Sequence, residues 1–267
     1  MKFPADLSAK TQAAMREVAE TYILPRYKKL AEGDVKSKSH PNDLVTIADV
    51  ESEHALTRML PDFLPGSRVV GEEAVAADAK VLDSLAGSDP VWIVDPIDGT
   101  ANFVKGEASF AVMIALVQSG ETLAGWIHDP VINRTLWAEK GAGAWLTVGQ
   151  TTVPVKMPAP PSDNLHDLTA GIYNRGFKSL VGKFHRVTRI GSAAHDYWSL
   201  SDGRMHVLCF SRMRPWDHAA GVLICAEAGG YSCMLSGKPY APALADQVGI
   251  VSAPSRHIWE IVVNAKS

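Results

Sequence analysis

The chain has 267 residues, of which 46% are hydrophobic, so it can bury a core for one large domain or two packed subdomains. Its net charge of −3 at pH 7 includes no basic excess, which argues against a nucleic-acid polymer as the main ligand. Its three cysteines form no Cys-x-x-Cys pair, which argues against a disulfide framework and a structural zinc site and indicates free thiols in a reducing compartment.

The first third of the chain predicts two helices and a short strand. Apolar residues three and four positions apart indicate an amphipathic helix over Asp6–Tyr27, disturbed near Pro25. A second helix is expected from Ala48 to Leu60, where Pro61 should end it. The next elements are a strand over Arg68–Val70 and an alanine-rich helix or crossover over Ala74–Leu85.

The stretch Val91–Thr100 is an apolar run that ends in two carboxylates three positions apart. Its β-branched residues predict a buried strand, with Asp95 placed where the strand leaves the core. Because Pro96 has no N–H donor, it should stop the pairing ladder. Gly99 then permits a close backbone approach before a helical turn. We therefore expect an oxygen-rich corner at this point.

The middle of the chain predicts an antiparallel meander followed by a linker. Four strands separated by turn signals are expected over Phe110–Val117, Leu123–Asp129, Arg134–Glu139 and Ala144–Thr147. From Gln150 to Asp167 the composition changes to Pro, Ser, Asp and Thr, which is typical of a linker. We therefore predict an N-terminal α+β subdomain over residues 1–153 and a C-terminal α/β subdomain over residues 154–267.

The last third predicts alternating strands and helices. Strands are expected over Leu168–Tyr173, Met205–Phe210, Tyr231–Leu235 and Val248–Val251, and helices over Phe177–Arg186, Ala193–Ser201, Asp217–Ala228 and from Ser255 onward. No apolar run reaches the roughly 18–20 residues that span a bilayer, and the first residues lack the apolar segment of a signal peptide. These features predict a soluble, cytoplasmic protein with no membrane contact.

Three expected element ends place a carboxylate beside an apolar run: Glu72, the Asp95/Asp98 pair, and Asp217. An Asp-x-x-Asp pattern alone is weak evidence, because aspartates are common in solvated turns. If the three ends converge, however, two carboxylates about 4 Å apart repel by roughly 4 kcal/mol at an effective dielectric of 20. Cations or shared protons must then offset the repulsion. All-oxygen ligands favour Mg²⁺, Mn²⁺ or Ca²⁺ over zinc.

Five ordered segments of this sequence resemble the motifs of the inositol monophosphatase family. They are Asp43–Asp49, Gly71–Glu73, Trp92–Phe103, Gly191–Ala194 and Trp216–Gly221. The resemblance implies an α+β fold, a layered αβαβα sandwich of the inositol monophosphatase and fructose-1,6-bisphosphatase type. It also implies a Mg²⁺-dependent, lithium-sensitive phosphatase with two or three ions per site, for which Mn²⁺ is an alternative, and homodimers are common in the family.

The resemblance also implies roles for individual residues. The implied metal ligands are Glu72, Asp95, Asp98, Asp217 and the Ile97 carbonyl. Thr100 and Asp49 match the pair that orients the attacking water, with Glu72 close by. The backbone N–H groups of Gly99 and Thr100, at the start of a helix, are suited to phosphate oxygens. An aspartyl nucleophile at Asp95 or Asp98 is the rival mechanism, and it is disfavoured because both carboxylates are committed to metal.

The expected substrate contacts depart from the family pattern at one position. They are Asp98, Gly191, Ser192, Ala193, Phe210, Arg212 and Asp217. Inositol-specific members carry a glutamate where this chain has Phe210, so an acceptor for sugar hydroxyls is missing. Arg212 either contacts a second anionic group or is solvated or paired with structural acids. His218 is expected at the surface or rim of the site rather than as a catalytic base.

The sequence therefore predicts hydrolysis of a small phosphate monoester by a metal-activated water, with inositol monophosphate as the family default. Histidinol phosphate, 3′-phosphoadenosine nucleotides and sugar bisphosphates are alternative substrates. The alternative from another class is a metal-binding scaffold that has lost turnover.

Overall fold

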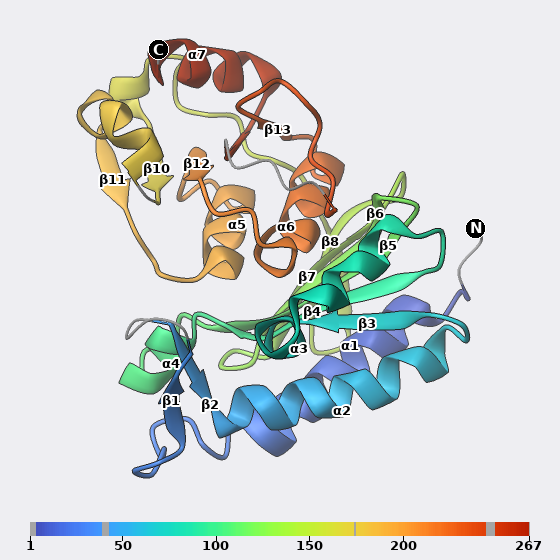
Figure 1. Cartoon of the computed structure of the whole chain (residues 1–267). Helices are drawn as coiled ribbons and strands as arrows, with labels where there is room; N and C mark the ends of the chain where they lie inside the picture. Colours follow the sequence, from blue (N-terminus) through green and yellow to red (C-terminus); the bar gives the residue numbers. More distant parts are fainter. Residues whose placement is uncertain (1–3, 39–42, 174, 244–248, 267) are drawn as a thin grey trace.

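The computed structural model describes residues 4–38, 43–173, 175–243 and 249–266. Two sheets alternate with three helical layers in Figure 1: α1 and α2, a seven-stranded sheet, α5 and α6, a five-stranded sheet, and α7. One apolar cluster lies between α1, α2 and the seven-stranded sheet, a second surrounds α5 and α6 and includes residues of both sheets, and a third lies between the five-stranded sheet and α7. This arrangement confirms the predicted α+β, αβαβα fold.

The outer layer on the N-terminal side consists of α1 (Leu7–Val18), its π-helical extension η1 (Ala19–Ile23) and α2 (Ile47–Phe63). Helix α2 continues two residues past Pro61, so the predicted end at Leu60 is wrong. A proline in the last turn removes one backbone hydrogen bond where the helix is about to end. Beside α2, the strands β1 (Val35–Ser37) and β2 (Leu44–Thr46) form an antiparallel ribbon.

The seven-stranded sheet has its strands in chain order, and only β3 and β4 are parallel. The antiparallel neighbours confirm the predicted meander. The strands are β3 (Arg68–Gly71), β4 (Val91–Asp98), β5 (Ala111–Gln118), β6 (Glu121–Asp129), β7 (Arg134–Glu139), β8 (Gly143–Val148) and β9 (Thr151–Val155).

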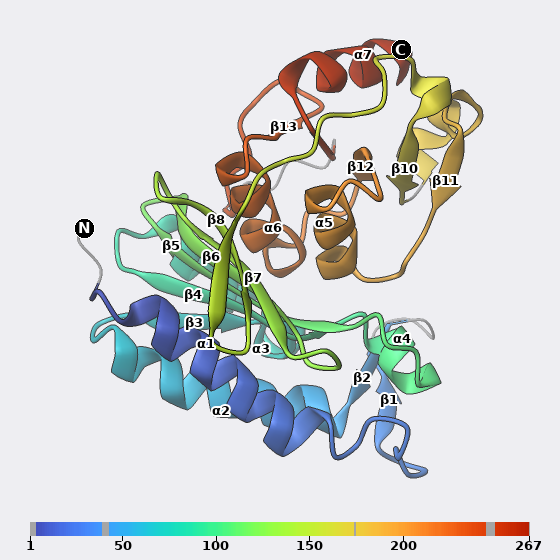
Figure 2. The same cartoon turned by 180° about the vertical axis from the view of Figure 1, so that it is seen from behind.

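Strand β9 lies where the sequence predicts linker. Its exposed position at the edge of the sheet tolerates Pro154, because an edge strand does not need every N–H group for pairing. The segment after β9 then runs from the sheet to the upper half of the molecule (Figure 2). The division at residues 153 and 154 stays a prediction, and it falls inside β9.

Strand β4 is buried on both faces. Val91 and Ile93 pack towards α5 and α6, whereas Trp92 and Val94 pack towards α1 and α2. Pairing with β5 does not stop at Pro96 but resumes at Asp98 after a shift of register. The proline therefore makes an irregularity inside the strand rather than its end. Asp95 and Asp98 flank this irregularity.

The connections around β4 are short helices. They are α3 (Glu72–Ala77), the 3-10 helix η2 (Ala79–Ala86) and α4 (Thr100–Lys105).

The five-stranded sheet has the order β11-β10-β12-β14-β13. Its strands are β10 (Thr169–Ile172), β11 (Arg186–Thr188), β12 (Val207–Phe210), β13 (Tyr231–Met234) and β14 (Ile250–Ala253). The helices of this half are η3 (Leu165–Asp167), η4 (Arg175–Lys183), α5 (Ala193–Ser201), α6 (Pro215–Glu227) and α7 (Arg256–Lys266). Strand β11 replaces the end of a predicted helix, and Val248 of the expected last strand lies outside the described residues.

Helices α5 and α6 pack closely because of a glycine. A Cβ at Gly221 of α6 would lie 2.1 Å from Cδ2 of Tyr197 on α5, so this position admits no side chain. The predicted free thiols are confirmed, since Cys209, Cys225 and Cys233 are unpaired and buried. Within the described part of the chain, no helix is long and apolar enough to cross a membrane.

Candidate active site

Three aspartates from two elements meet at one point. Asp95 and Asp98 come from the end of β4, and Asp217 comes from the first turn of α6. One carboxylate oxygen from each lies within 4.8 Å of the others. A cavity of about 210 Å³ opens there, and Glu72, Ile97, Gly99 and Thr100 also line it. The structure thus brings all the predicted metal ligands to one place.

The N-terminus of α5 holds Asp98 in position. Its Oδ2 accepts hydrogen bonds from Ser192 Oγ at 2.5 Å and from Ala194 N at 2.8 Å, and its Oδ1 accepts one from Ala193 N at 3.1 Å. Asp95 is held locally, because its Oδ1 accepts from Ile97 N at 3.1 Å. Donors at a helix N-terminus favour a negative carboxylate. Asp98 therefore links the seven-stranded sheet to the C-terminal half.

The three carboxyl groups are under electrostatic stress. Burial raises the pKa of Asp95 well above its usual value, and the charges of Glu72, Asp98 and Asp217 raise it further. Burial, Asp98 and Glu72 likewise raise the pKa of Asp217. Burial raises the pKa of Asp98 too, although its hydrogen bonds from α5 oppose that rise. A buried carboxylate cluster of this kind requires protons or cations to offset its charge.

A hard divalent cation fits this donor set. The converging groups are oxygen atoms alone. Asp95 and Asp98 are buried and Asp217 is half-buried, and the three are crowded enough to repel one another without a cation. The carboxylates of Asp95, Asp98 and Asp217 would hold the ion, with Glu72 and the Ile97 carbonyl on the same cavity wall.

The crowding predicts how stability changes with pH when no metal is bound. A carboxyl whose pKa is raised by folding contributes stability below its unfolded pKa, about 4, and loses it as the pH rises through the folded pKa. Histidine side chains also titrate near pH 6.5. Between about pH 6.5 and 7.5, the part of the change in stability that belongs to the carboxylate cluster is therefore the part that saturating Mg²⁺ removes. We expect the free energy of unfolding in EDTA to fall by about 1–3 kcal/mol over this range.

Urea unfolding at the two pH values measures this change, and saturating Mg²⁺ is the control that should remove most of it. Equal stability at both pH values in EDTA would contradict the claim that folding raises the pKa values of the clustered carboxyl groups.

Two cations that the sequence analysis did not assign to the site face Glu72. Lys38 Nζ lies 3.0 Å from Glu72 Oε1 and 2.6 Å from Glu73 Oε1, and Arg214 lies 3.5 Å from Glu72 Oε1. Burial lowers the pKa of Lys38, but Glu72 and Glu73 outweigh it, so the pKa is raised overall. In the sequence, Lys38 could have been suspected only from its position, because it is a cation five residues before the Asp43–Asp49 motif. Glu72 therefore lies between the cluster and two positive charges.

Asp49 and Thr100 form the predicted hydroxyl–carboxylate pair. Thr100 Oγ1 lies 3.2 Å from Asp49 Oδ1 and 2.9 Å from the Ile97 carbonyl oxygen. Asp49 sits in the first turn of α2, where it forms a capping box with Thr46. Burial raises the pKa of Asp49 to about 6, although hydrogen bonds from Thr46 oppose the rise. The pair lies beside the cluster, and Asp49 itself does not line the cavity.

Gly99 needs to be glycine for two reasons. Its φ of +88° lies in the left-handed region, and a Cβ there would lie 2.7 Å from the Ser109 carbonyl oxygen and 3.0 Å from Ser192 Cβ. The turn from β4 into α4 thus brings the backbone close to the α5 N-terminus, as the sequence analysis expects for this glycine.

A second cavity, of about 420 Å³, adjoins the first and shares Asp98, Gly191, Arg212 and Asp217 with it. All seven predicted substrate contacts line this cavity. Phe210 lies in its wall, stacked between Tyr173 at 5.3 Å and Tyr197 at 5.8 Å between ring centroids. The lining of this cavity therefore combines aromatic side chains, Tyr173 and Phe210, with the carboxylates of Asp98 and Asp217.

His218 was expected at the surface or rim of the site. It lines the second cavity, but its side chain is buried with 1% exposure, so placement at the surface is wrong. Its Nε2 lies 2.7 Å from the Arg212 carbonyl oxygen, and its Nδ1 lies 3.2 Å from Tyr197 Oη. Burial lowers the pKa of His218 to about 4, which keeps the ring neutral. His218 thus fixes the loop before α6 against α5.

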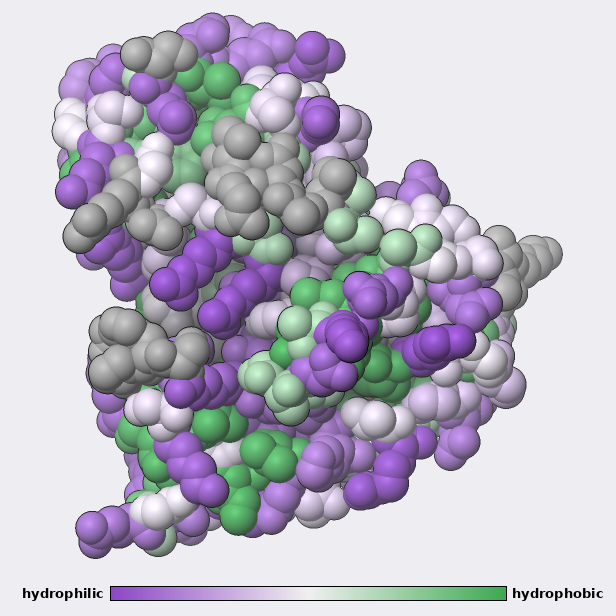
Figure 3. Space-filling model, viewed as in Figure 1, coloured by the Kyte–Doolittle hydropathy of each residue, from purple (hydrophilic) through white to green (hydrophobic). Residues whose placement is uncertain are grey.

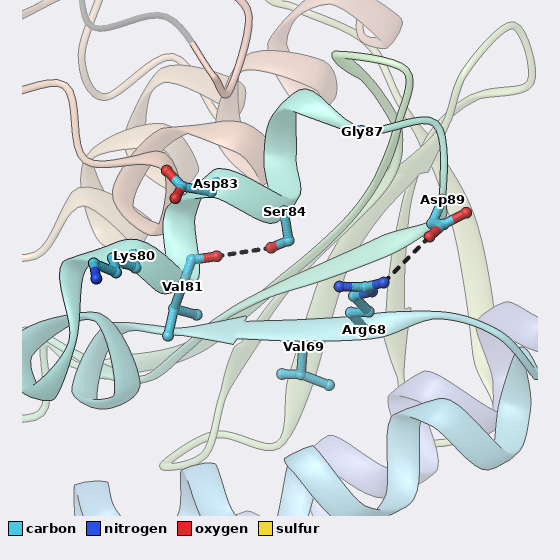
Figure 4. Close-up of a pocket in the computed structure, with 8 residues that line it drawn as sticks. All are labelled: Arg68, Val69, Lys80, Val81, Asp83, Ser84, Gly87 and Asp89. Atoms are coloured by element: carbon cyan, nitrogen blue, oxygen red, sulfur yellow. Dashed lines mark hydrogen bonds and ion pairs between the residues drawn. The ribbon is translucent and has the colours of Figure 1, made fainter.

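Figure 3 shows strongly hydrophilic side chains between the upper and lower halves of the molecule, as well as over much of the rest of this face. Another cavity, of about 470 Å³, lies at the opposite end of β3 (Figure 4). There Arg68 pairs with Asp89 at 3.6 Å, and none of the clustered carboxylates lines it. The cavity at the start of β3 is therefore separate from the ends of β3 and β4 that carry Glu72 and Asp98.

Comparison with known proteins identifies the family whose motifs the sequence resembles. The inositol monophosphatase family matches residues 6–265. Inositol-1-monophosphatase of Bacillus subtilis is 32% identical over 240 residues, covering 87% of this chain and 88% of the relative. A Thermotoga maritima protein named fructose-1,6-bisphosphatase/inositol-1-monophosphatase is 31% identical over 205 residues, covering 77% of each chain.

A solved structure of a Thermotoga maritima IMPase is similar to the fold, with a TM-score of 0.80 at 27% identity. It covers 98% of this chain and 96% of that chain. This chain therefore belongs to the inositol monophosphatase family, a family of phosphoric monoester hydrolases.

Proposed function

We propose that this protein hydrolyses a small phosphate monoester with an activated water, in a reaction that requires Mg²⁺, and that inositol monophosphate is its default substrate. The observation that carries the proposal is the convergence of Asp95, Asp98 and Asp217 beside a cavity that shares two of these residues. Phosphate monoester hydrolysis is extremely slow without catalysis, so neutralising the charge of the dianion must supply much of the rate.

The proposed ligands of two or three Mg²⁺ ions are Glu72, Asp95, Asp98, Asp217 and the Ile97 carbonyl, and Mn²⁺ suits the same oxygen atoms. When bound, the ions would supply charge neutralisation at the phosphate and lower the pKa of a bound water. The backbone at Gly99 and Thr100, which faces the same cavity, is the proposed phosphate contact.

Asp49 and Thr100 act on the attacking water. Thr100 has one hydroxyl proton and two acceptors in reach, Asp49 Oδ1 at 3.2 Å and the Ile97 carbonyl oxygen at 2.9 Å. If the Ile97 carbonyl holds a metal ion, the hydroxyl proton is left for an ionised Asp49, and the Thr100 oxygen can accept a water proton. A covalent route through Asp98 is disfavoured, because three donors from α5 already hold that carboxylate.

A second candidate substrate class is a sugar or nucleoside bisphosphate. It is favoured by two residues that line the second cavity, Phe210 and Arg212. Phe210 supplies an aromatic surface and no acceptor for sugar hydroxyls. The exposed Arg212 guanidinium makes no hydrogen bond or ion pair with any other described residue. A guanidinium binds a second phosphate with two parallel hydrogen bonds. The Thermotoga maritima relative carries a bisphosphatase name, which agrees with this alternative.

A substrate panel tests both candidates. Phosphate release with Mg²⁺ is measured from inositol monophosphate, histidinol phosphate, 3′-phosphoadenosine 5′-phosphate and fructose 1,6-bisphosphate. If a bisphosphate is preferred, Arg212→Ala should raise its KM by about 10–100-fold, the effect of losing a charge-assisted contact.

Arg256→Ala is the matched control, because Arg256 lies far away on α7 and pairs with Glu260 in solvent. Inositol monophosphate hydrolysis should respond much less to Arg212→Ala than bisphosphate hydrolysis does, and it should not respond to Arg256→Ala. Mg²⁺ binding with no phosphate release from any compound would instead support the scaffold alternative.

A further inference from the structure

A chain of contacts runs from Asp98 away from the cavity. Ser192 Oγ donates to Asp98 Oδ2, and His195 Nδ1 lies 3.1 Å from the same Ser192 oxygen. On the other side of the imidazole, Nε2 lies 3.5 Å from Asp129 Oδ2. The His195 side chain is 12% exposed and that of Asp129 is 5% exposed, so solvent does not compete strongly for these contacts.

The single hydroxyl proton of Ser192 makes this chain directional. Ionised Asp98 accepts hydrogen bonds only, so Ser192 must give its proton to Asp98 and can only accept from His195. His195 must therefore present Nδ1–H to Ser192. If Nδ1 carried no proton, Ser192 would have two acceptors and one proton, and Asp98 would share its hydroxyl donor. The backbone N–H of His195 also donates to Ser192 Oγ, at 3.2 Å. A proton on Nδ1 thus fills the second lone pair of the serine oxygen and leaves Asp98 as the acceptor of the serine proton.

Asp129 is a fixed anchor for the imidazole. It closes the turn between β6 and β7, where its Oδ1 accepts hydrogen bonds from Val131 N at 3.0 Å and Ile132 N at 3.3 Å. Arg134, 3.8 Å from Asp129 Oδ2, also stacks on Trp198 of α5 with its guanidinium carbon 4.0 Å from the ring centroid. The end of β6 and the start of β7 therefore contact α5 at two points, His195 and Trp198.

We propose that His195 is a positioning residue, through which Asp129 orients Ser192 so that Asp98 keeps the geometry needed to bind a divalent cation. The inference rests on the proposed metal site. It adds that Asp129, at the end of β6, holds the site in place through His195 and Ser192 at the start of α5. Partners of this kind, one shell outside the ligands, commonly change metal affinity by about 10–100-fold when they are removed.

The test is Mg²⁺ and Mn²⁺ binding measured by isothermal titration calorimetry on the full chain, without substrate. Two variants test the two ring nitrogens of His195 separately. His195→Asn keeps an N–H donor near the Nδ1 position, whereas His195→Gln reaches the Nε2 position and loses the donor to Ser192. We expect His195→Gln and His195→Leu to weaken binding by about tenfold or more, and His195→Asn to stay much closer to wild type.

Thermal unfolding in EDTA is measured for each variant, so that lost affinity is read only from folded protein. Ser192→Ala should weaken metal binding, and His195→Leu should add little to it, because the two residues act in series. Equal metal affinity in folded His195→Leu and wild type would overturn the inference, and so would equal losses in the Asn and Gln variants. Wild-type protein that binds neither ion would instead refute the proposed metal site itself.

Discussion

Asp95→Asn is expected to reduce Mg²⁺-dependent phosphatase activity by about 10³-fold or more, because it removes a ligand from a site whose main task is charge neutralisation. The amide keeps the size of the side chain and can still accept from Ile97 N through its oxygen, so the turn before Ile97 should survive. Phosphate release at saturating Mg²⁺ measures the loss. Unchanged turnover would refute the metal assignment.

The same variant should become more stable when metal is absent. The wild-type carboxyl is 2% exposed and faces the charges of Glu72, Asp98 and Asp217, whereas the amide carries no charge. Removing one member of the cluster should raise the free energy of unfolding in EDTA by about 1–3 kcal/mol. The matched control is Asp62→Asn, at an exposed position of α2 that should change neither property. Gain of stability together with loss of turnover is expected of a functional site rather than a structural one.

Local sequence carried most of the information about the N-terminal side of the site. The apolar run before Asp95 predicts a buried strand, and both of its faces are covered in the structure. The five ordered motifs predicted which distant carboxylates meet, and Asp95, Asp98 and Asp217 do meet. Neither inference required a long-range contact to be guessed from composition.

What the sequence did not predict depends on contacts between layers. Pro96 should end a strand by its own chemistry, but β5 pairs again at Asp98, so the tertiary partner overrides the local preference. His218 follows Asp217 in the Trp216–Gly221 motif and was expected at the surface or rim of the site. It is buried because Tyr197 and the Arg212 carbonyl satisfy both ring nitrogens. The pairing of His195 with Asp129 spans 66 positions of the chain, and no local pattern indicates it.

Thr100→Val is expected to lower kcat by about 10²–10³-fold while leaving Mg²⁺ affinity unchanged. Valine has the shape of threonine without the hydroxyl, so the water would lose the acceptor that Asp49 polarises. The effect should fall on kcat because Asp49 and the hydroxyl of Thr100 act on the nucleophile rather than on substrate binding.

Thr100→Ser restores the hydroxyl and should recover most of the activity, which separates chemistry from packing at the start of α4. In wild type, burial raises the pKa of Asp49 to about 6, so kcat should fall as the pH drops through this value and Asp49 takes up a proton. The valine variant has no hydroxyl for Asp49 to polarise, so its low residual rate should lack that acid limb. A pH profile of kcat for the three proteins tests whether Asp49 causes the acid limb. If Thr100→Val shows an acid limb of the same midpoint and depth, the limb belongs to another group.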